Sequence, residues 1–388
     1  MPQVNNPSAT PWGAIFAGLS ASLVGIGLAR FAYTPLLPAL IEGQWFQASD
    51  AAYLGAANLA GYLGGALAAR PLAARLPAAA ILRAAMALTA LAFVACASPL
   101  SFLWFFGWRF VSGVTGGLLM ALAAPTVLPH VPAARRGLAS GAIFTGVGLG
   151  VAASGTIVPP LLQEGLAWTW YGLGAVSAVL TLLAWRAWPS ALPDATPSAS
   201  RPSGGIVLKV FYGEYALNAV GIVPHMVFLV DFVARGLGQG IHVGASYWVI
   251  FGGGALIGSL LAGFVADRIG FRAAMRGAYL LQAAAVALPI FATGPWALVL
   301  SSVVIGAFVP GVVALALGRV QELLPGDPSA QRAAWGLTTV AWAVGQASSA
   351  YFFSYLYGQT GGYGFLFAIG SGALVLAFVL DLIWGRRS

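Results

Sequence analysis

The sequence predicts an all-α membrane protein with twelve transmembrane helices, arranged as two six-helix pseudo-repeats. Three observations lead to this prediction. Of the 388 residues, 60% are hydrophobic and only 7% are charged, whereas a soluble globular protein has roughly 25% charged residues. The hydrophobic residues lie in long runs separated by short polar connections. The basic residues fall mainly in alternate connections, as expected for a multi-pass membrane protein.

Twelve apolar segments are long enough to form the predicted helices. A helix needs about 20 residues to cross the ~30 Å hydrocarbon core of a bilayer, and tilt accommodates longer segments. The segments cover residues 12–40, 50–69, 78–97, 100–126, 138–162, 167–187, 207–234, 243–265, 273–293, 296–318, 333–357 and 362–384. A secretory signal peptide has a basic start and a shorter apolar core, so we expect the first segment to be a retained helix.

The positions of the basic residues test the helix count independently. Fifteen of the 18 Lys and Arg residues lie in even-numbered connections or in the C-terminal tail. These fifteen are Arg70, Arg75, Arg83, Arg135, Arg136, Arg186, Arg201, Lys209, Arg268, Arg272, Arg276, Arg319, Arg332, Arg386 and Arg387. Arg235 lies in an odd-numbered connection, and Arg30 and Arg109 lie inside predicted helices. Because cytoplasmic loops carry the excess of basic residues, the alternation supports twelve helices with both termini in the cytoplasm.

The longest polar stretch divides the chain after the sixth segment. Residues 189–205 are rich in Pro, Ser, Ala and Gly, a composition typical of flexible linkers. The predicted organisation is a cytoplasmic tail at 1–11, a six-helix half at 12–188, a cytoplasmic linker at 189–205 and a second six-helix half at 206–388. The stretches 65–70 and 263–268 align as a weak internal repeat. Paired repeats of this kind are typical of secondary transporters.

The composition argues against catalysis, a cofactor and nucleotide binding. With three His residues and the single cysteine Cys96, neither a metal centre nor a disulfide framework is expected. The sole lysine, Lys209, is not part of a phosphate-binding loop, which argues against ATP as the energy source. The scattered basic residues argue against a nucleic-acid partner. A membrane-embedded enzyme or a sensor is a weaker alternative, because the sequence offers neither a nucleophile beside a base nor a soluble output domain.

One loop resembles the signature of a known family. The residues Gly263-x3-Asp267-Arg268-x-Gly270-x-Arg272 resemble the cytoplasmic loop signature of the major facilitator superfamily (MFS), and they lie between segments eight and nine, where that superfamily repeats it. The resemblance implies the MFS fold and a cytoplasmic gate, in which Asp267 would meet a helix end or a basic side chain. The alternative is a set of solvated loop charges.

Further stretches are similar to the YbfB/YjiJ group of bacterial MFS transporters. They are residues 25–38, 58–65 and 109–117 and the pair Gly345-Gln346, so the resemblance extends over nearly the whole chain. It implies a multi-pass protein of the bacterial cytoplasmic (inner) membrane. We expect a monomer that moves a small organic solute by alternating access, with protons as the coupling ion. An uncoupled facilitator is the alternative.

Two arginines inside predicted helices are candidate site residues. A charged side chain at the centre of a bilayer costs at least ~2.5 kcal/mol, so Arg30 and Arg109 are expected to have a role. Helix geometry places them at similar depth in the first and fourth helices. We predict that they hold an anionic group of a substrate or coupling ion, or act as switch partners of a carboxylate. The alternative is a structural cation bonded to carbonyls at a helix end.

The seventh helix carries three titratable side chains that are candidate proton carriers. His225 lies at the depth of Arg30 in the repeat-related first helix, and histidine titrates near neutral pH. Asp231 lies near the outer end of this helix and Glu214 near its cytoplasmic end. A hydrogen-bonded core histidine and solvated carboxylates are the alternatives. Pro224 removes a backbone donor and is predicted to break or kink the helix.

Other polar and small residues complete the prediction. Tyr33, Asn58, Tyr62 and Gln346 are polar groups on otherwise apolar helices, and they are candidates to line a central cavity. Glycines at four-residue spacing, at positions 61 and 65 and at positions 113 and 117, predict close packing between helices.

Overall fold

The computed structural model describes residues 11–132, 135–189 and 205–384. Within these ranges the chain forms helices joined by short connections, and no strand is present. The predicted tail at 1–11 and the predicted linker at 189–205 lie almost wholly outside the described residues. The basic residues Arg201, Arg386 and Arg387 lie outside them as well.

Every apolar segment predicted from the sequence is helical, and the observed ends lie within five residues of the predicted ones. The elements are α1 (Trp12–Ser22), η1 (Leu23–Leu28), α2 (Tyr33–Glu42), α3 (Ala48–Ala73), α4 (Ala78–Cys96), α5 (Phe102–Val127), η2 (Leu128–His130), α6 (Arg136–Glu164), α7 (Leu166–Ala184), α8 (Gly205–Asp231), η4 (Phe232–Gly236), α9 (Ile241–Ile269), α10 (Phe271–Phe291), α11 (Pro295–Leu323), α12 (Pro328–Thr360) and α13 (Gly364–Trp384). In the described part of the chain, 10 helical segments are long and apolar enough to cross a membrane.

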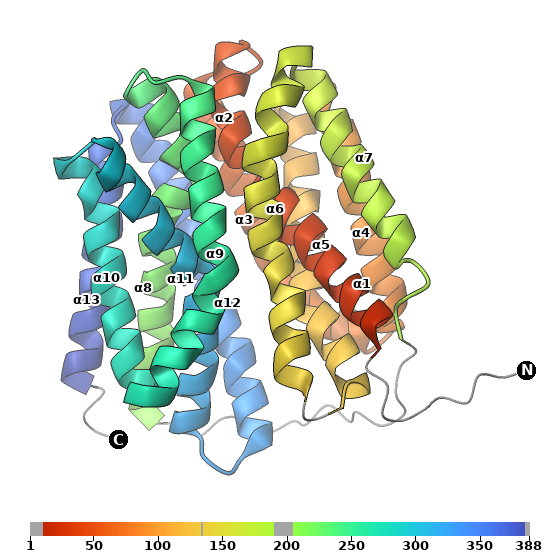
Figure 1. The fold of residues 1–388 in the computed structure, drawn as a ribbon, viewed down its shortest axis with the longest axis vertical. Helices are drawn as coiled ribbons and strands as arrows, with labels where there is room; N and C mark the ends of the chain where they lie inside the picture. The colour runs from red at the N-terminus through yellow and green to blue at the C-terminus, as the bar shows by residue number, and fades with distance from the viewer. Residues whose placement is uncertain (1–10, 133–134, 190–204, 385–388) are drawn as a thin grey trace, which may run out of the picture.

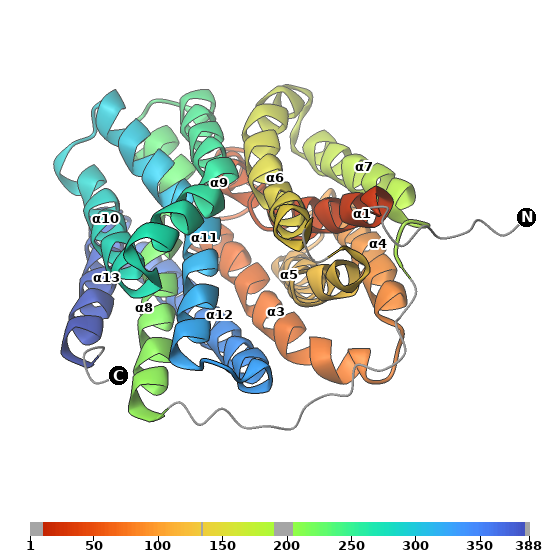
Figure 2. The ribbon, with the colours of Figure 1, turned by 60° about the horizontal axis from the view of Figure 1, so that its bottom comes forward.

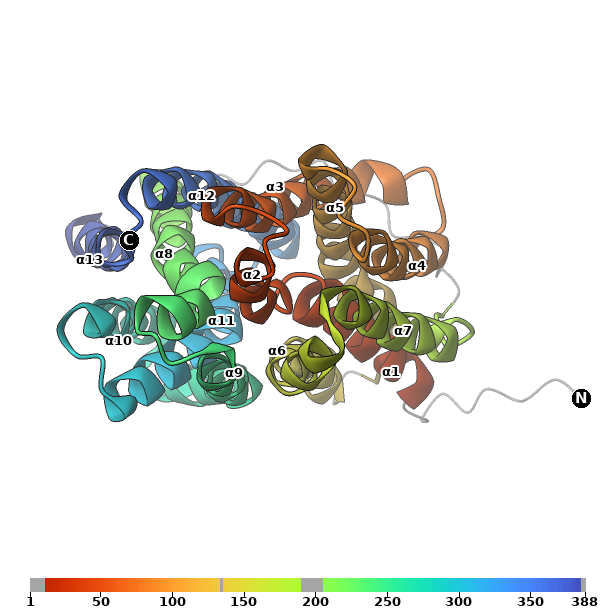
Figure 3. The same cartoon turned by 90° about the horizontal axis from the view of Figure 1, so that it is seen from above.

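The helices form two groups. Figure 1 shows α1 to α7, which we call the N-terminal bundle, beside α8 to α13, which we call the C-terminal bundle. The start of α1 and the end of α13 lie at the same end of the molecule, at the bottom of Figure 1. The bundles meet where α3 packs on α12 and α6 packs on α9 (Figures 2 and 3).

The interface position explains why α3 and α12 are less apolar than the other long helices. Both lie between the bundles, and each has a polar side chain in the middle of the helix that is covered by protein. Asn58 of α3 and Gln346 of α12 are only 2% and 1% exposed. Polar groups at membrane depth are tolerated where they are buried in protein and not in lipid.

Glycines allow α3 and α5 to cross with their backbones in contact. A Cβ atom added to Gly61 would lie 2.0 Å from a backbone oxygen of α5, and one added to Gly113 would lie 2.0 Å from a backbone oxygen of α3. The C-terminal bundle repeats this arrangement, because a Cβ on Gly258 of α9 would lie 1.9 Å from a backbone oxygen of α11. The close packing predicted from glycine spacing is therefore observed.

The first membrane segment is interrupted. The π-helix η1 and a turn at 29–32 separate α1 from α2. A Cβ on Gly27 would lie 2.6 Å from the Cα of Gly150, so η1 packs directly on α6. Pro35 has no N–H to donate to the carbonyl four residues earlier, which weakens the regular hydrogen bonding across the turn. The carbonyl of Ala29, at this interruption, accepts a hydrogen bond from a side chain of α5.

The seventh segment differs from its prediction. α8 runs without interruption through Pro224, so this proline does not break the helix, and a kink at this position stays a prediction. Neighbouring helices tolerate a proline in such a segment because they compensate the freed backbone group. The irregular turn lies further along, in the π-helix η4.

Candidate functional site

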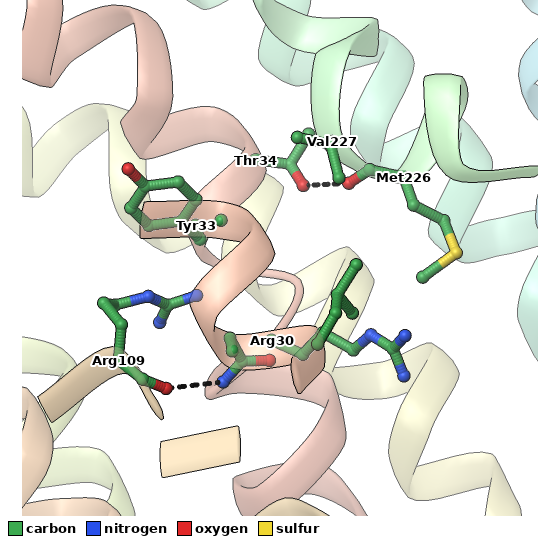
Figure 4. A pocket seen from close by; sticks show the side chains of 9 residues that line it. Arg30, Tyr33, Thr34, Arg109, Met226 and Val227 are labelled. Atoms are coloured by element: carbon green, nitrogen blue, oxygen red, sulfur yellow. Dashed lines mark hydrogen bonds between the residues drawn. The ribbon is translucent and has the colours of Figure 1, made fainter. Parts of the chain in front are cut away.

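A small cavity lies between the two bundles, where the turn before α2 and the helices α2, α3 and α5 meet α8. The residues that line it are Arg30, Tyr33, Thr34, Gly55, Asn58, Leu59, Arg109, Met226 and Val227 (Figure 4). Its free space accommodates about one water molecule. Four residues predicted from the sequence therefore line one cavity: Arg30, Tyr33, Asn58 and Arg109.

Arg109 binds the interrupted first segment. Its residue exposure is only 2%, and Nη1 donates a hydrogen bond of 2.8 Å to the carbonyl oxygen of Ala29. The guanidinium also lies over the ring of Tyr33, 4.3 Å from its centroid. A planar guanidinium can donate to a carbonyl and stack on an aromatic face at the same time. This geometry matches the alternative of a structural cation at a helix end.

Asn58 connects three segments beside Arg109. Its side-chain nitrogen donates to Ser112 Oγ at 2.8 Å, and it lies 3.4 Å from the backbone oxygen of Arg109 and 3.5 Å from that of Ala29. The Ser112 hydroxyl donates to the Arg109 backbone oxygen at 2.8 Å. Tyr33 adds a hydrogen bond of 2.6 Å to a backbone oxygen of α3. Together these bonds fix the wall of the cavity.

Arg30 lacks the partners that Arg109 has. Its Nε and Nη2 atoms are buried without a hydrogen-bond partner, and no described carboxylate forms an ion pair with it. Its guanidinium lies 5.1 Å from the ring centroid of Tyr62 and 5.6 Å from that of Phe31. In Figure 4 the guanidinium of Arg30 points away from Arg109, whereas that of Arg109 points toward the turn before α2.

The C-terminal bundle closes the cavity on one side. Thr34 Oγ1 donates a hydrogen bond of 2.5 Å to the carbonyl oxygen of Met226 (Figure 4). Gln346 contacts the same residue, because its Nε2 lies 3.4 Å from the sulfur of Met226. Gln346 is therefore next to the lining and not part of it, and its Oε1 is buried without a partner. Tyr62 also lies outside the lining and contributes its ring to the surroundings of Arg30.

Asp231 is held in a hydrogen-bonded cluster at the end of α8. It is 0% exposed and accepts hydrogen bonds from Tyr363 at 2.7 Å, Tyr357 at 3.0 Å and Arg235 at 3.1 Å. Burial, reinforced by the Asp231 charge, raises the pKa of the Tyr363 hydroxyl, which keeps this group a donor. The cluster compensates the buried carboxylate and joins α8 to the connection between α12 and α13.

His225 faces the interior of the C-terminal bundle and not the cavity. Its Nε2 lies 2.6 Å from Ser301 Oγ, and Ser301 donates its own proton to the carbonyl oxygen of Ala285 at 2.6 Å. Nε2 is therefore the donor in the contact with Ser301. Nδ1 is buried without a partner, and the ring packs 5.2 Å from that of Phe367. This environment matches the alternative of a core histidine.

Glu214 lies inside the C-terminal bundle near a cluster of charges. It is 4% exposed, and no hydrogen bond or ion pair joins it to a described residue. Its charged neighbours are Asp381 of α13, Arg319 of α11, and Arg272 and Arg276 of α10. Asp381 pairs with Arg276 and lies 3.8 Å from Arg272, and Arg319 pairs with Glu322 at 3.1 Å.

Comparison with known proteins identifies the family. The family model described as "Uncharacterised MFS-type transporter YbfB" matches residues 22–382. The chain belongs to this MFS family. It is a multi-pass membrane transporter and not an enzyme, as the family indicates. A comparison with curated proteins gives no significant sequence match.

Solved structures of MFS transporters are similar to this one. The crystal structure of a D-xylose-proton symporter has a TM-score of 0.77 at 15% identity, over 96% of this chain and 97% of that one. The nucleoside transporter NupG, solved as a mutant, has a TM-score of 0.77 at 16% identity, over 96% and 98%. A partially occluded inward-open xylose transporter XylE from E. coli has a TM-score of 0.73 at 16% identity, over 97% and 98%. At these identities the similarity shows the MFS fold alone.

The loop motif of this MFS transporter makes its described contacts within the C-terminal bundle. Asp267 is exposed and has no ion pair with a described residue. Arg268 donates to the Phe264 backbone oxygen at 3.0 Å and lies over the Phe264 ring. Gly270 has a φ of +84° between α9 and α10, a conformation that favours glycine. Gly263 has open space around it, and Arg272 lies near Asp381. A role of these residues as a gate stays a prediction.

Several residues in and around the site of this MFS transporter were not predicted from the sequence. Thr34 and Met226 close the cavity, and Ser301 binds His225; nothing in their local sequence distinguishes them. Asp381 did leave a signal, because it is an acidic residue inside the predicted last helix. An ionisable side chain inside a membrane helix is a candidate functional residue by default.

Proposed function

We propose that this MFS transporter is a secondary active transporter of the bacterial cytoplasmic membrane, which moves a small organic solute by alternating access and couples this movement to protons. The proposed topology has twelve membrane-spanning helices in two halves, 12–188 and 206–388. The tail at 1–11, the linker at 189–205 and the C-terminus are cytoplasmic. The functional unit is a monomer.

The position of the cavity carries this proposal. Arg30 and Tyr33 of its lining come from the N-terminal bundle, and Met226 and Val227 come from the C-terminal bundle. A site shared by two bundles changes its exposure when the bundles rock against each other, which is the basis of alternating access. A site inside one bundle would not be opened and closed in this way.

Helix composition and basic residues support the topology. Ten segments meet the requirements of length and hydropathy, and we assign α3 and α12 to the same set because polar side chains in their middle, Asn58 and Gln346, are buried in protein. Arg70 and Arg75 lie where α3 leads into α4, and Arg268 and Arg272 lie where α9 leads into α10. The excess of basic residues in such connections supports a cytoplasmic location for them.

At the end of the molecule opposite the proposed cytoplasmic connections, contacts between the two bundles support a conformation that is closed toward the outside. The rings of Tyr53 and Tyr351 lie 6.2 Å apart, which joins α3 to α12. A Cβ atom on Gly358 would lie 3.1 Å from the Cβ of Ser49. With the hydrogen bond between Thr34 and the Met226 backbone, these contacts hold the outer halves of both bundles together.

Glu214 is the proton carrier that the geometry favours among the three titratable residues of α8. Asp231 accepts hydrogen bonds from a cation and two hydroxyls, so protonation would disrupt a compensated cluster. His225 already donates from Nε2 within the core. Glu214 is a buried carboxyl to which the described residues offer no hydrogen bond or ion pair, and protonation relieves the cost of burying its charge. A similar fold is found in a proton symporter, which supports protons as the coupling ion by analogy of fold.

Reconstitution into liposomes tests the coupling. A thermal-shift screen of small solutes first identifies a ligand, and its uptake is then measured with and without a pH gradient. We expect the gradient to drive uptake by the wild type. Glu214→Gln should abolish gradient-driven accumulation and retain exchange of the ligand across the membrane. The matched control is Glu164→Gln, at an exposed carboxyl at the end of α6, which should retain both activities.

The alternative of an uncoupled facilitator predicts a different result. Wild-type uptake that equilibrates the ligand and ignores the pH gradient would contradict proton coupling. A gradient response that persists in Glu214→Gln and disappears in His225→Ala would assign the proton to His225.

A further inference from the structure

We propose that the transported solute is a small organic carboxylate whose anionic group binds to Arg30. This inference rests on the proposed transport function and names the substrate class of the same cavity. Its basis is a buried guanidinium edge in the lining of the cavity for which the described chain supplies no partner.

The charges of the N-terminal bundle are not balanced within the membrane. Arg30 and Arg109 lie at its centre, whereas the acidic residues of 12–188 are Glu42, Asp50 and Glu164. These three lie in the last turn of α2, the first turn of α3 and the last residue of α6. None of them forms an ion pair with either arginine. The counter-charge for the cavity must therefore come from outside this bundle.

The C-terminal bundle does not supply the missing carboxylate either. Asp231 forms an ion pair with Arg235 and accepts hydrogen bonds from two tyrosine hydroxyls. Glu214 has its charged neighbours on α10, α11 and α13, within its own bundle, and it does not line the cavity. A solute that enters the cavity is the remaining source of negative charge.

The two arginines differ in what they leave free. Arg109 donates Nη1 to the Ala29 carbonyl and stacks on Tyr33, so its position is explained by the interrupted helix. In the described part of the chain, Arg30 leaves both Nε and Nη2 without partners, whereas Arg109 leaves only Nε. The two atoms of Arg30 form one edge of the guanidinium, and their N–H bonds are parallel. Such an edge binds the two oxygens of a carboxylate simultaneously, which a single ammonium group cannot do.

The surroundings of Arg30 favour an anionic partner over water. The rings of Tyr62 and Phe31 lie 5.1 and 5.6 Å from its guanidinium carbon. Aromatic faces attract the cation but carry no charge that neutralises it. A charge-assisted hydrogen bond is stronger in such a desolvated place than in water. The site therefore discriminates a carboxylate from the uncharged amide of the same shape.

Matched ligand pairs test this discrimination. Purified protein is heated with benzoate, phenylacetate, lactate or succinate, and each compound is compared with its amide. We expect at least one carboxylate to raise the melting temperature of the wild type more than its amide does. In Arg30→Gln the affinity for that carboxylate should fall by about 10- to 100-fold, and Arg30→Lys should restore only part of it. Arg75→Gln, at an exposed arginine in the connection after α3, is the control and should bind as the wild type does.

A second measurement does not depend on finding a ligand. Arg30→Met removes a partly buried cation whose Nε and Nη2 have no partner among the described residues, and it should raise the melting temperature of the ligand-free protein. Arg109→Met leaves the Ala29 carbonyl without its donor and should lower it. A melting temperature of Arg30→Met that falls as far as that of Arg109→Met would overturn the proposal, because Arg30 would then be a structural cation.

The outcomes separate this inference from the transport proposal. If an uncharged sugar or nucleoside binds, is transported, and binds equally well to Arg30→Gln, the anionic substrate is refuted and transport stands. A panel in which no carboxylate stabilises the wild type more than its amide also refutes it. If a carboxylate binds through Arg30 but is not moved across liposomes, the transport proposal fails and the binding site stands.

Discussion

Replacement of Asp231 by Asn tests whether this buried carboxylate anchors the end of α8 or carries a proton. The change keeps the shape of the side chain and removes its charge. Three donors converge on the carboxylate, from Tyr363 at 2.7 Å, Tyr357 at 3.0 Å and Arg235 at 3.1 Å. An anchor should lose stability in the variant and retain coupled transport.

The magnitude follows from the three donors. A hydrogen bond to a charged group contributes about 1.5–3 kcal/mol and a neutral one about 0.5–1.5 kcal/mol, so neutralising the acceptor costs about 1 kcal/mol for each donor. The smaller cost of burying an amide offsets part of this sum, and side-chain hydrogen bonds in membrane proteins average only about 0.6 kcal/mol. We expect Asp231→Asn to lower the free energy of unfolding by about 2 kcal/mol.

Equilibrium unfolding in mixed micelles with increasing dodecyl sulfate measures this loss. Tyr363→Phe removes one donor and should cost about 1 kcal/mol, and the double variant should cost less than the sum of the two single ones because the residues interact. Tyr355→Phe, at an exposed tyrosine of α12, is the control. If Asp231→Asn is as stable as the wild type but loses gradient-driven uptake, the anchoring role of Asp231 is refuted and Asp231 is the proton carrier.

Two further predictions concern packing inside the bundles. Gly113→Ala should lower the free energy of unfolding by about 1–3 kcal/mol, because its Cβ would lie 2.0 Å from a backbone oxygen of α3. The control is Gly64→Ala, whose Cβ would have ordinary contacts at 3.8 Å and which should leave stability unchanged or slightly raised. Equal losses of stability in the two variants would contradict the packing argument. Ser301→Ala should lower the free energy of unfolding by about 1 kcal/mol, because it removes the acceptor of the His225 Nε2 proton. Ser246→Ala, at an exposed serine, is the control. An unchanged unfolding transition in Ser301→Ala would contradict the assigned hydrogen bond.

The helices were predictable because hydropathy is a local property. Each apolar segment is followed by polar or basic residues, so its ends could be located to within five residues. The interruptions were not predictable in the same way. Pro224 lies in a continuous helix, whereas the π-helix η1 depends on how Gly27 meets Gly150, more than a hundred residues away. Tertiary packing and not the local sequence decides where a membrane helix becomes irregular.

The candidate site could be predicted as a set of residue types but not as a geometry. The cost of burying a charge singled out Arg30 and Arg109 from the sequence, and both line one cavity. The sequence does not show which of the two arginines has a hydrogen-bond partner. Arg109 has one because the interruption of the first segment makes the carbonyl of Ala29 available as an acceptor. Likewise, the tyrosine donors to Asp231 come from positions 126 and 132 residues further along the chain.

A reversible cross-link between the outer ends of the bundles tests alternating access most directly. A Cβ on Gly358 of α12 would lie 3.1 Å from the Cβ of Ser49 of α3, close to the spacing of roughly 3.5–4.5 Å in disulfides. The pair Ser49→Cys and Gly358→Cys, in a Cys96→Ala background, should form a disulfide that stops uptake of the thermal-shift ligand, and reduction should restore it. Each single cysteine variant is the control. Uptake that continues at the wild-type rate with the disulfide fully formed would contradict a transport cycle in which the outer ends separate.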